Sequence, residues 1–255
     1  MSPDPRLFID TPLAAGARIA LERDQAHYLV NVMRREQGSG VRLFNGRDGE
    51  WQGVLAEASR RAAVLEIAGQ LREQAGVPDI TLCFAPVKKA RTDFIVEKAT
   101  ELGAARIQPV ITRRTQSERV RTDRLQAIAR EAAEQTERLC LPEIAEPVSL
   151  DQLLDQWPAT TRLIFCDEAG EGEGPWGGKA GRAMSMADML RGQTDLAGAW
   201  AILIGPEGGF APEERSRLRG LEFVRPVTLG PRILRADTAA LSALTLWQAM
   251  AGDWR

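Results

Sequence analysis

The chain has 255 residues with 33 basic and 35 acidic side chains, which gives a formal charge of -2 at pH 7. This length allows a sizeable core in one or two domains, and the charge balance excludes a uniformly basic nucleic-acid binder, so such a partner needs a local patch. No apolar run reaches transmembrane length and the N-terminus lacks a signal-peptide pattern, so we expect a cytoplasmic protein without a membrane partner.

The first seventy or so residues are rich in β-type patterns. Short apolar runs separated by glycine and asparagine turns predict strands near 6–9, 17–22, 41–44, 51–58 and 63–68, with one helix at 24–33. Such a series of strands indicates a small barrel. The polar segment 72–78 ends in a Gly/Pro break and is the predicted linker, so we expect domains at 1–73 and 77–255.

After the predicted linker, strands alternate with helices. We expect strands at 80–85, 106–110 and 163–166 and helices at 92–102 and 122–139, the pattern of a parallel α/β sheet. Residues 169–195 carry much glycine and charge without a period, which favours a long surface loop with a helix near 184–191.

Two sharp turns, each closing a short apolar run, follow in the last quarter of the chain. The run 200–204 leads through Gly205-Pro-Glu-Gly-Gly-Phe210 to a helix opened by Pro212, and the run 224–229 leads through Gly230-Pro-Arg-Ile-Leu-Arg235 to a helix at 239–250. Asp237 and Thr238 are the expected N-cap of that last helix. Adjacent loops at the carboxyl ends of parallel strands form a ligand crevice, and glycines let the backbone approach the ligand.

A segment at 172–177 matches the dinucleotide-binding pattern G-x-G-x-x-G. Two features oppose that function, because Glu171 and Glu173 would repel a pyrophosphate and Pro175 removes an amide that the phosphate needs. We therefore interpret this segment as part of the surface loop.

A locally basic stretch runs from Lys88 to Arg124, with ten basic against five acidic residues. A solvated charged face is the usual explanation, but arginines directly after a predicted strand suit contact with RNA phosphates. A second pair of arginines ends the helix predicted at 24–33. The candidate RNA-binding residues are Arg34, Arg35, Lys88, Arg91, Arg113 and Arg114.

The chain resembles the RsmE family of 16S rRNA uridine-N3 methyltransferases, of the SPOUT class, over nearly its whole length. The resemblance rests on 6–8, 27–34, 98–103, 107–109, Glu134, Gln135 and Arg138, and above all on 204–210 and 229–235. It implies a knotted SPOUT-type parallel-sheet methyltransferase domain with a trefoil knot, preceded by a small PUA-like RNA-binding β-barrel. It also implies S-adenosyl-L-methionine as methyl donor, a homodimer, and methylation of N3 of uracil-1498, in standard rRNA numbering, in the small ribosomal subunit.

The same resemblance implies the site residues. The donor is expected among Leu203, Gly205, Glu207, Gly208, Gly209, Leu229, Gly230, Ile233 and Leu234. Arg138 and Arg232 are the catalytic candidates for contact with phosphate or the target base. The family's usual Arg-Thr-Glu-Thr is here Arg235-Ala-Asp-Thr238, which leaves the role of Asp237 open, and no residue is an obvious general base.

Two alternatives remain at this point: another SPOUT RNA methyltransferase with a different target atom, and a non-catalytic RNA-binding or ribosome-assembly factor. The three scattered cysteines and the single His27 indicate neither a disulfide framework nor a metal site, so we expect no metal. The second domain lacks histidine and a usable cysteine nucleophile, which argues against a mechanism with covalent attack on the base.

Overall fold

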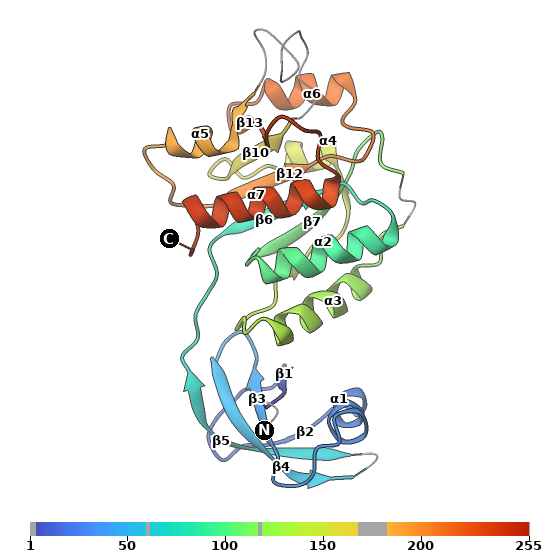
Figure 1. Ribbon diagram of the computed structural model, residues 1–255, viewed down its shortest axis with the longest axis vertical. Coiled ribbons are helices and arrows are strands. Elements are labelled where there is room, and N and C mark those ends of the chain that lie inside the picture. Colours follow the sequence, from blue (N-terminus) through green and yellow to red (C-terminus); the bar gives the residue numbers. More distant parts are fainter. Residues whose placement is uncertain (1–3, 60–61, 117–118, 168–182, 255) are drawn as a thin grey trace. The chain divides into compact units, whose positions relative to one another are not determined.

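The computed structural model describes residues 4–59, 62–116, 119–167 and 183–254. The chain forms two compact units (Figure 1). The first contains Met1–Gly76 together with Ala133–Leu141, and the second contains Val77–Ala132 and Pro142–Arg255. The segment 133–141 therefore packs with the N-terminal sheet although it lies far along the sequence.

The N-terminal unit is built on a five-stranded sheet in the order β1-β3-β4-β5-β2. Its strands are β1 (Arg6–Phe8), β2 (Arg18–Ala20), β3 (Gly40–Phe44), β4 (Glu50–Ala58) and β5 (Ala63–Arg72). β1 pairs with β3 in parallel and the other pairs are antiparallel. Three register shifts interrupt the pairing of β4 with β5, and such irregularities bend and twist a sheet. All five predicted strands are confirmed.

The helix predicted at 24–33 is composite. It begins as α1 (Arg23–His27) and continues as a π-helical turn, η1 (Tyr28–Val32), in which the Met33 amide donates to the Tyr28 carbonyl at 2.9 Å. Arg34 then takes a left-handed φ of 53°, which ends the helix.

A buried arginine, Arg6, connects the N-terminal sheet to the segment 133–141. Arg6 on β1 contacts Glu50 on β4, and the exposed fraction of both side chains is 2%. The same guanidinium donates to the carbonyls of Ala133, at 2.7 Å, and Arg138, at 2.8 Å. Burial lowers the pKa of Arg6, and its hydrogen bond with Glu50 opposes that shift.

The second unit is an eight-stranded, wholly parallel sheet with β11-β13-β10-β12-β6-β7-β8 in order and β9 paired to β7. Its strands are β6 (Ile80–Phe84), β7 (Arg106–Ile111), β8 (Glu143–Ile144), β9 (Val148–Ser149), β10 (Arg162–Cys166), β11 (Met184–Ser185), β12 (Trp200–Ile204) and β13 (Val224–Thr228). Its helices are α2 (Lys89–Glu101), α3 (Thr122–Gln135, whose last turn belongs to the first unit), α4 (Leu150–Asp155), α5 (Met186–Arg191), α6 (Pro212–Arg219) and α7 (Ala236–Met250). The predicted parallel α/β sheet is confirmed.

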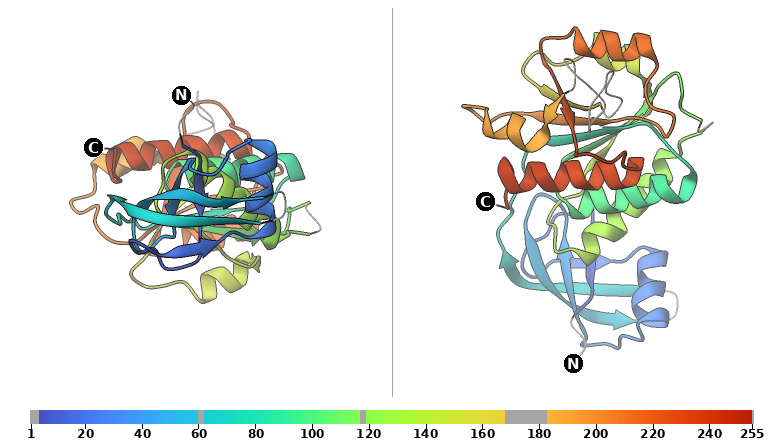
Figure 2. Two further views of the ribbon diagram at one scale, coloured as in Figure 1. Left: turned by 90° about the horizontal axis from the view of Figure 1, so that it is seen from below. Right: turned by 45° about the horizontal axis from the view of Figure 1, so that its top comes forward.

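Helices cover both faces of this sheet (Figures 1 and 2). Side chains of β12 point alternately into two cores, with Trp200, Ile202 and Ile204 on the face of α2, α5 and α7. Ala201 and Leu203 lie on the face of α4 and α6. All five residues are buried, as expected for a central strand of a parallel sheet.

Several boundaries differ from the sequence prediction. α3 ends at Gln135 rather than near 139, because Glu137 adopts a left-handed φ of 60° and its carboxylate binds Arg42 at 3.0 Å. α2 begins at Lys89, three residues early, and the Thr92 hydroxyl bonds back to the Val87 carbonyl at 3.0 Å.

The expected N-cap of the last helix is also wrong. The N-cap residue is Arg235, and Asp237 lies in the first turn of α7, where its carboxylate accepts the Thr238 amide at 2.8 Å. The elements β8, β9 and α4 were not predicted, because two-residue strands and a six-residue helix are too short to show a period. The segment 172–177 lies outside the described residues, and the trefoil knot stays a prediction.

Candidate ligand-binding site

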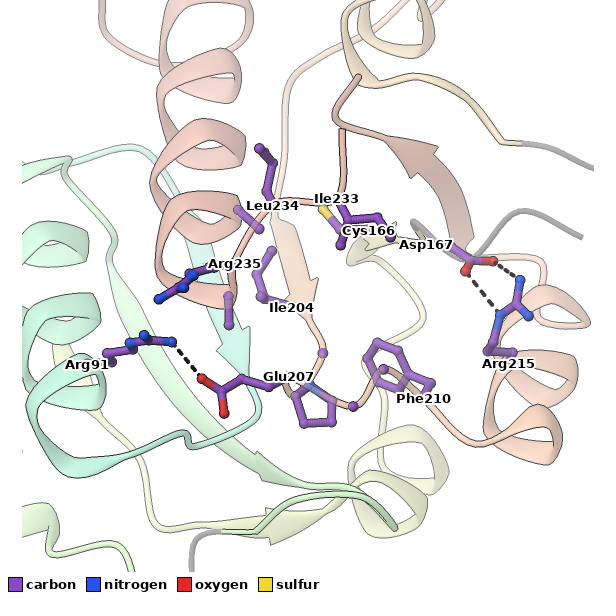
Figure 3. Close-up of a pocket in the computed structure, with 16 residues that line it drawn as sticks. Arg91, Cys166, Asp167, Ile204, Glu207, Phe210, Arg215, Ile233, Leu234 and Arg235 are labelled. Carbon is purple, nitrogen blue, oxygen red and sulfur yellow. Dashed lines mark hydrogen bonds and ion pairs between the residues drawn. The ribbon is translucent and has the colours of Figure 1, made fainter. Parts of the chain in front are cut away.

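Both glycine-rich loops open onto one cavity of about 570 Å³ at the carboxyl ends of β10 and β12 (Figure 3). Six of the predicted donor-site residues line it: Gly205, Glu207, Gly208, Gly209, Ile233 and Leu234. Three others do not. Leu203 is fully buried in the core beneath the sheet, Leu229 packs against the core on the other face, and Gly230 shapes the second turn with a φ of 122°.

A different structural reason explains why glycine occupies each of the three positions 205, 208 and 209 in the first loop. A Cβ at Gly205 would lie 2.5 Å from the Phe210 ring, so that position accepts no side chain. Gly209 has a φ of 66°, and its amide closes the turn on the Pro206 carbonyl at 2.8 Å. A Cβ at Gly208 would meet only Arg114, at 3.8 Å, so the protein's own packing does not require this glycine.

The loop after β7 is fastened to the first glycine loop and to α6. The buried Glu214 carboxylate accepts the amides of Arg113 and Ala211, both at 2.8 Å. The Arg114 guanidinium donates to the Gly208 carbonyl at 2.9 Å, and Arg113 pairs with the exposed Glu213 at 2.9 Å. Glu214 therefore fixes the entrance to α6 and positions two of the predicted RNA-binding arginines.

Two ion pairs lie on opposite sides of the cavity (Figure 3). On one side Arg91, predicted to bind RNA, reaches Glu207 at 2.6 Å and comes within 3.9 Å of Asp237. On the other, Asp167 binds Arg215 at 3.0 Å and Arg219 at 2.6 Å, with 2% of its side chain exposed.

Sequence reasoning missed Asp167 and Arg215 as cavity residues. A signal for Asp167 existed, because it directly follows a predicted buried strand, β10, and carboxyl ends of parallel strands meet at one edge of the sheet. Arg215 carried no such signal, since its place depends on how α6 docks.

Apolar surface separates these charges. Cys166, Ile204, Phe210, Ile233 and Leu234 line the cavity between the two ion pairs, and Ile233 is 86% exposed. The arrangement combines an apolar middle, exposed backbone at the glycines and charged groups at both sides. Such a lining suits a small molecule with an apolar body and polar ends.

The remaining predicted residues lie elsewhere. Arg232 is exposed in the second loop, outside the cavity lining. Arg138 belongs to the N-terminal unit, is largely buried, and donates from Nε to the Cys140 carbonyl at 2.7 Å. Arg34 and Arg35 follow the π-helical turn of the same unit, and the exposed Lys88 is the N-cap of α2.

Cys83 is not an activated nucleophile. Complete burial raises the pKa of the Cys83 thiol to about 12, which keeps it protonated at neutral pH. Across 4–59, 62–116, 119–167 and 183–254, no group of three or more His, Cys, Asp or Glu side chains could hold a metal ion. Within the same ranges no helix has the length and apolarity to cross a bilayer.

Family comparisons cover both parts of the chain. Residues 74–248 match the family described as RNA methyltransferase domain, and residues 21–68 match the family described as RNA methyltransferase PUA domain.

Curated relatives bear the name ribosomal RNA small subunit methyltransferase E. The protein of Rickettsia conorii is 30% identical over 241 residues, which cover 94% of this chain and 93% of that protein. The protein of Synechocystis is 31% identical over 250 residues, which cover 96% of this chain and 77% of that protein.

Solved structures agree with these relatives. Ribosomal RNA small subunit methyltransferase E from Neisseria gonorrhoeae, crystallised with S-adenosylmethionine, is 28% identical with a TM-score of 0.85, covering 99% of this chain and 100% of that one. A methyltransferase from Legionella pneumophila with bound S-adenosylmethionine is 29% identical with a TM-score of 0.85, covering 98% of this chain and 99% of that one. The domain match extends over more than half of the residues and the Rickettsia relative over nearly all of them, so the chain belongs to the RsmE family of ribosomal RNA small subunit methyltransferases.

Proposed function

We propose that this protein transfers a methyl group from S-adenosylmethionine to N3 of a uridine in 16S rRNA of the small ribosomal subunit, uracil-1498 in standard numbering. The observation that carries the proposal is the cavity of about 570 Å³ formed by the two glycine-rich loops. Its volume lies within the range of about 300–1,000 Å³ usual for small-molecule and cofactor sites. Two solved structures that resemble this chain with TM-scores of 0.85 contain bound S-adenosylmethionine, which supports the choice of donor.

The lining residues fit this donor. Backbone groups of Gly208 and Gly209 are open to a ligand, since neither glycine carries a side chain over them, and they would hold the edge of the adenine. Ile204, Ile233 and Leu234 would cover its apolar surface. The charged groups at both sides of the cavity would hold the polar amino-acid end of the donor.

When bound, S-adenosylmethionine supplies a methyl group already activated by its sulfonium. The protein then has to align the acceptor nitrogen and favour loss of the uracil N3 proton, tasks of positioning and electrostatics. Arg232, exposed in the second loop, would stabilise the developing negative charge on the uracil, and Arg138 is the second candidate for this role. The target base leaves its stack to reach the cavity.

The N-terminal unit is proposed to hold the RNA around the target. It matches a PUA domain over residues 21–68, and its candidate contacts are Arg34 and Arg35. We propose the domain division at 1–73 and 77–255, and a cytoplasmic location, where small ribosomal subunits are found.

Primer extension on small-subunit rRNA tests the assignment. A methyl group at N3 occupies the Watson–Crick edge, so we expect reverse transcriptase to stop at the modified uridine in wild-type cells. The stop should vanish in cells that lack the protein and return when it is supplied in trans. Identical stop patterns in both strains would reject N3 methylation, and failure of the purified protein to bind S-adenosylmethionine in calorimetry would favour a non-catalytic RNA-binding factor.

A further inference from the structure

Two smaller cavities continue from the donor cavity along the surface of the second unit. The first, of about 190 Å³, shares Pro206, Glu207 and Gly208 with the donor cavity and adds Lys88, Lys89 and Arg114. The second, of about 230 Å³, shares Val87 and Lys89 with the first and reaches Arg119, Arg121 and Arg124. We call the two together the basic groove.

The basic groove carries positive charge that the described neighbours do not neutralise. Arg124 pairs with Asp93 and Arg121 with Asp123, so these two arginines are compensated. Within the described residues, the Arg114 side chain donates to a neutral carbonyl, that of Gly208. The side chains of Lys88, Lys89 and Arg119 are exposed and have no hydrogen bond or ion pair in the same parts of the chain.

Both lysines lie at the amino end of a helix, where a positive charge lowers helix stability. Lys88 is the N-cap of α2 and Lys89 its first residue, and the first turn contains no acidic side chain. The amino end of a helix carries partial positive charge, so cations there are unfavourable and anions are favoured. A serine N-cap, such as Ser149 of α4 and Ser185 of α5, stabilises a helix by accepting a backbone amide, whereas Lys88 makes no side-chain cap.

We propose that the basic groove binds the phosphodiester backbone of the RNA strand next to the nucleotide in the active site, with Lys88, Lys89 and Arg119 as direct phosphate contacts. The proposal rests on the proposed function, because the groove begins at Gly208, on the wall of the donor cavity. Phosphates would neutralise both lysines and would also interact favourably with the partial positive charge at the amino end of α2. Contacts to the backbone set register and orientation rather than sequence, so the groove would orient the strand while the cavity selects the base.

The test is RNA binding by the full chain without donor, measured by fluorescence anisotropy with a labelled single-stranded oligoribonucleotide over a range of salt. The variant is Lys88→Gln combined with Lys89→Gln. We expect affinity at low salt to fall roughly tenfold or more, since charged hydrogen bonds are lost. We also expect the slope of log affinity against log salt to flatten by about 1.4, which is two single-strand contacts.

The charge-matched control is Arg191→Gln combined with Arg225→Gln, which removes two cations from α5 and β13, outside the basic groove. This control should keep the wild-type salt slope. Because the lysines oppose the helix dipole, their replacement should leave the melting temperature unchanged or raised, and donor affinity by calorimetry should stay as in wild type. Should the double variant fold poorly, Lys89→Gln alone tests the same point with half the change in slope.

An unchanged salt slope in the lysine variant would overturn the proposal, as would an equal loss in the control. These outcomes are separable from failure of the proposed function, because RNA binding is measured without methyl transfer. If the wild-type protein methylates rRNA and the lysine variant binds RNA normally, RNA binding by the basic groove is rejected and the proposed function stands. If the variant loses RNA affinity but the wild-type protein methylates nothing, RNA binding by the groove stands and the proposed function is rejected.

Discussion

At the scale of single residues, a bound ligand rather than the fold explains the glycine at position 208. Gly205 and Gly209 are required by the Phe210 ring and by a left-handed backbone, but a side chain at Gly208 meets no close protein neighbour. We therefore predict that Gly208→Val leaves the protein folded and lowers S-adenosylmethionine affinity. A branched side chain forced into a filled site costs about 1–3 kcal/mol, or roughly fivefold to 150-fold in affinity.

Calorimetry measures the donor affinity, and circular dichroism checks the fold. Gly76→Val is the matched control, because Gly76 also has no close neighbour and lies far along the chain from the glycine loops. If the Gly208 variant binds S-adenosylmethionine with wild-type affinity, the first glycine loop is not part of the donor site.

At the scale of elements, Arg6 holds three segments of the N-terminal unit together: β1, β4 through Glu50, and the segment 133–141 through two carbonyls. Without Arg6, Glu50 keeps Arg72 as a partner at 2.9 Å, but the buried carbonyls of Ala133 and Arg138 lose their charged donor. Each buried acceptor left without a donor costs about 1–3 kcal/mol, so we predict that Arg6→Ala destabilises this unit by about 2–5 kcal/mol. Arg18→Ala, in the same sheet but from an exposed pair with Glu57, should cost at most about 1 kcal/mol.

Urea unfolding, followed by hydrogen exchange of the N-terminal strands, measures both variants. Exchange is preferable to a single transition midpoint, because a chain with two compact units need not unfold in one step. Equal losses for Arg6→Ala and Arg18→Ala would mean that the buried pair contributes no more than a surface pair.

At the scale of the whole molecule, the family resemblance predicts a homodimer. The sequence of the last helix, with Leu241, Leu244 and Trp247, also predicts more apolar surface than one sheet face can cover. That second argument is wrong, because in α7 Leu244 and Trp247 are buried and Leu241 packs against the same core within one chain. The dimer therefore stays a prediction that rests on the family, in which an interface is expected to be two-fold symmetric.

Light scattering during size exclusion at micromolar concentration measures the assembly. We expect a mass twice the 28.0 kDa of one chain. A mass near 28.0 kDa that does not rise with concentration would contradict the dimer.

The sequence by itself determined most strands and helices, the division into a β-rich part and a parallel α/β part, and the loops that form the cavity. These features have local signals. A buried parallel strand such as 200–204 is continuously apolar, and a turn with a positive φ favours glycine whatever the rest of the chain does. The nine donor residues came instead from the family resemblance, and six of them line the cavity.

Only the tertiary structure decided which side chains meet across long sequence distances. Arg91 pairs with Glu207 although 116 residues separate them, and Arg215 reaches Asp167 across 48 residues. The attachment of 133–141 to the N-terminal sheet through Arg6 is of the same kind. Charged side chains are common and carry no pattern that names their partner, so docking of helices and loops, rather than local periodicity, brings these groups together.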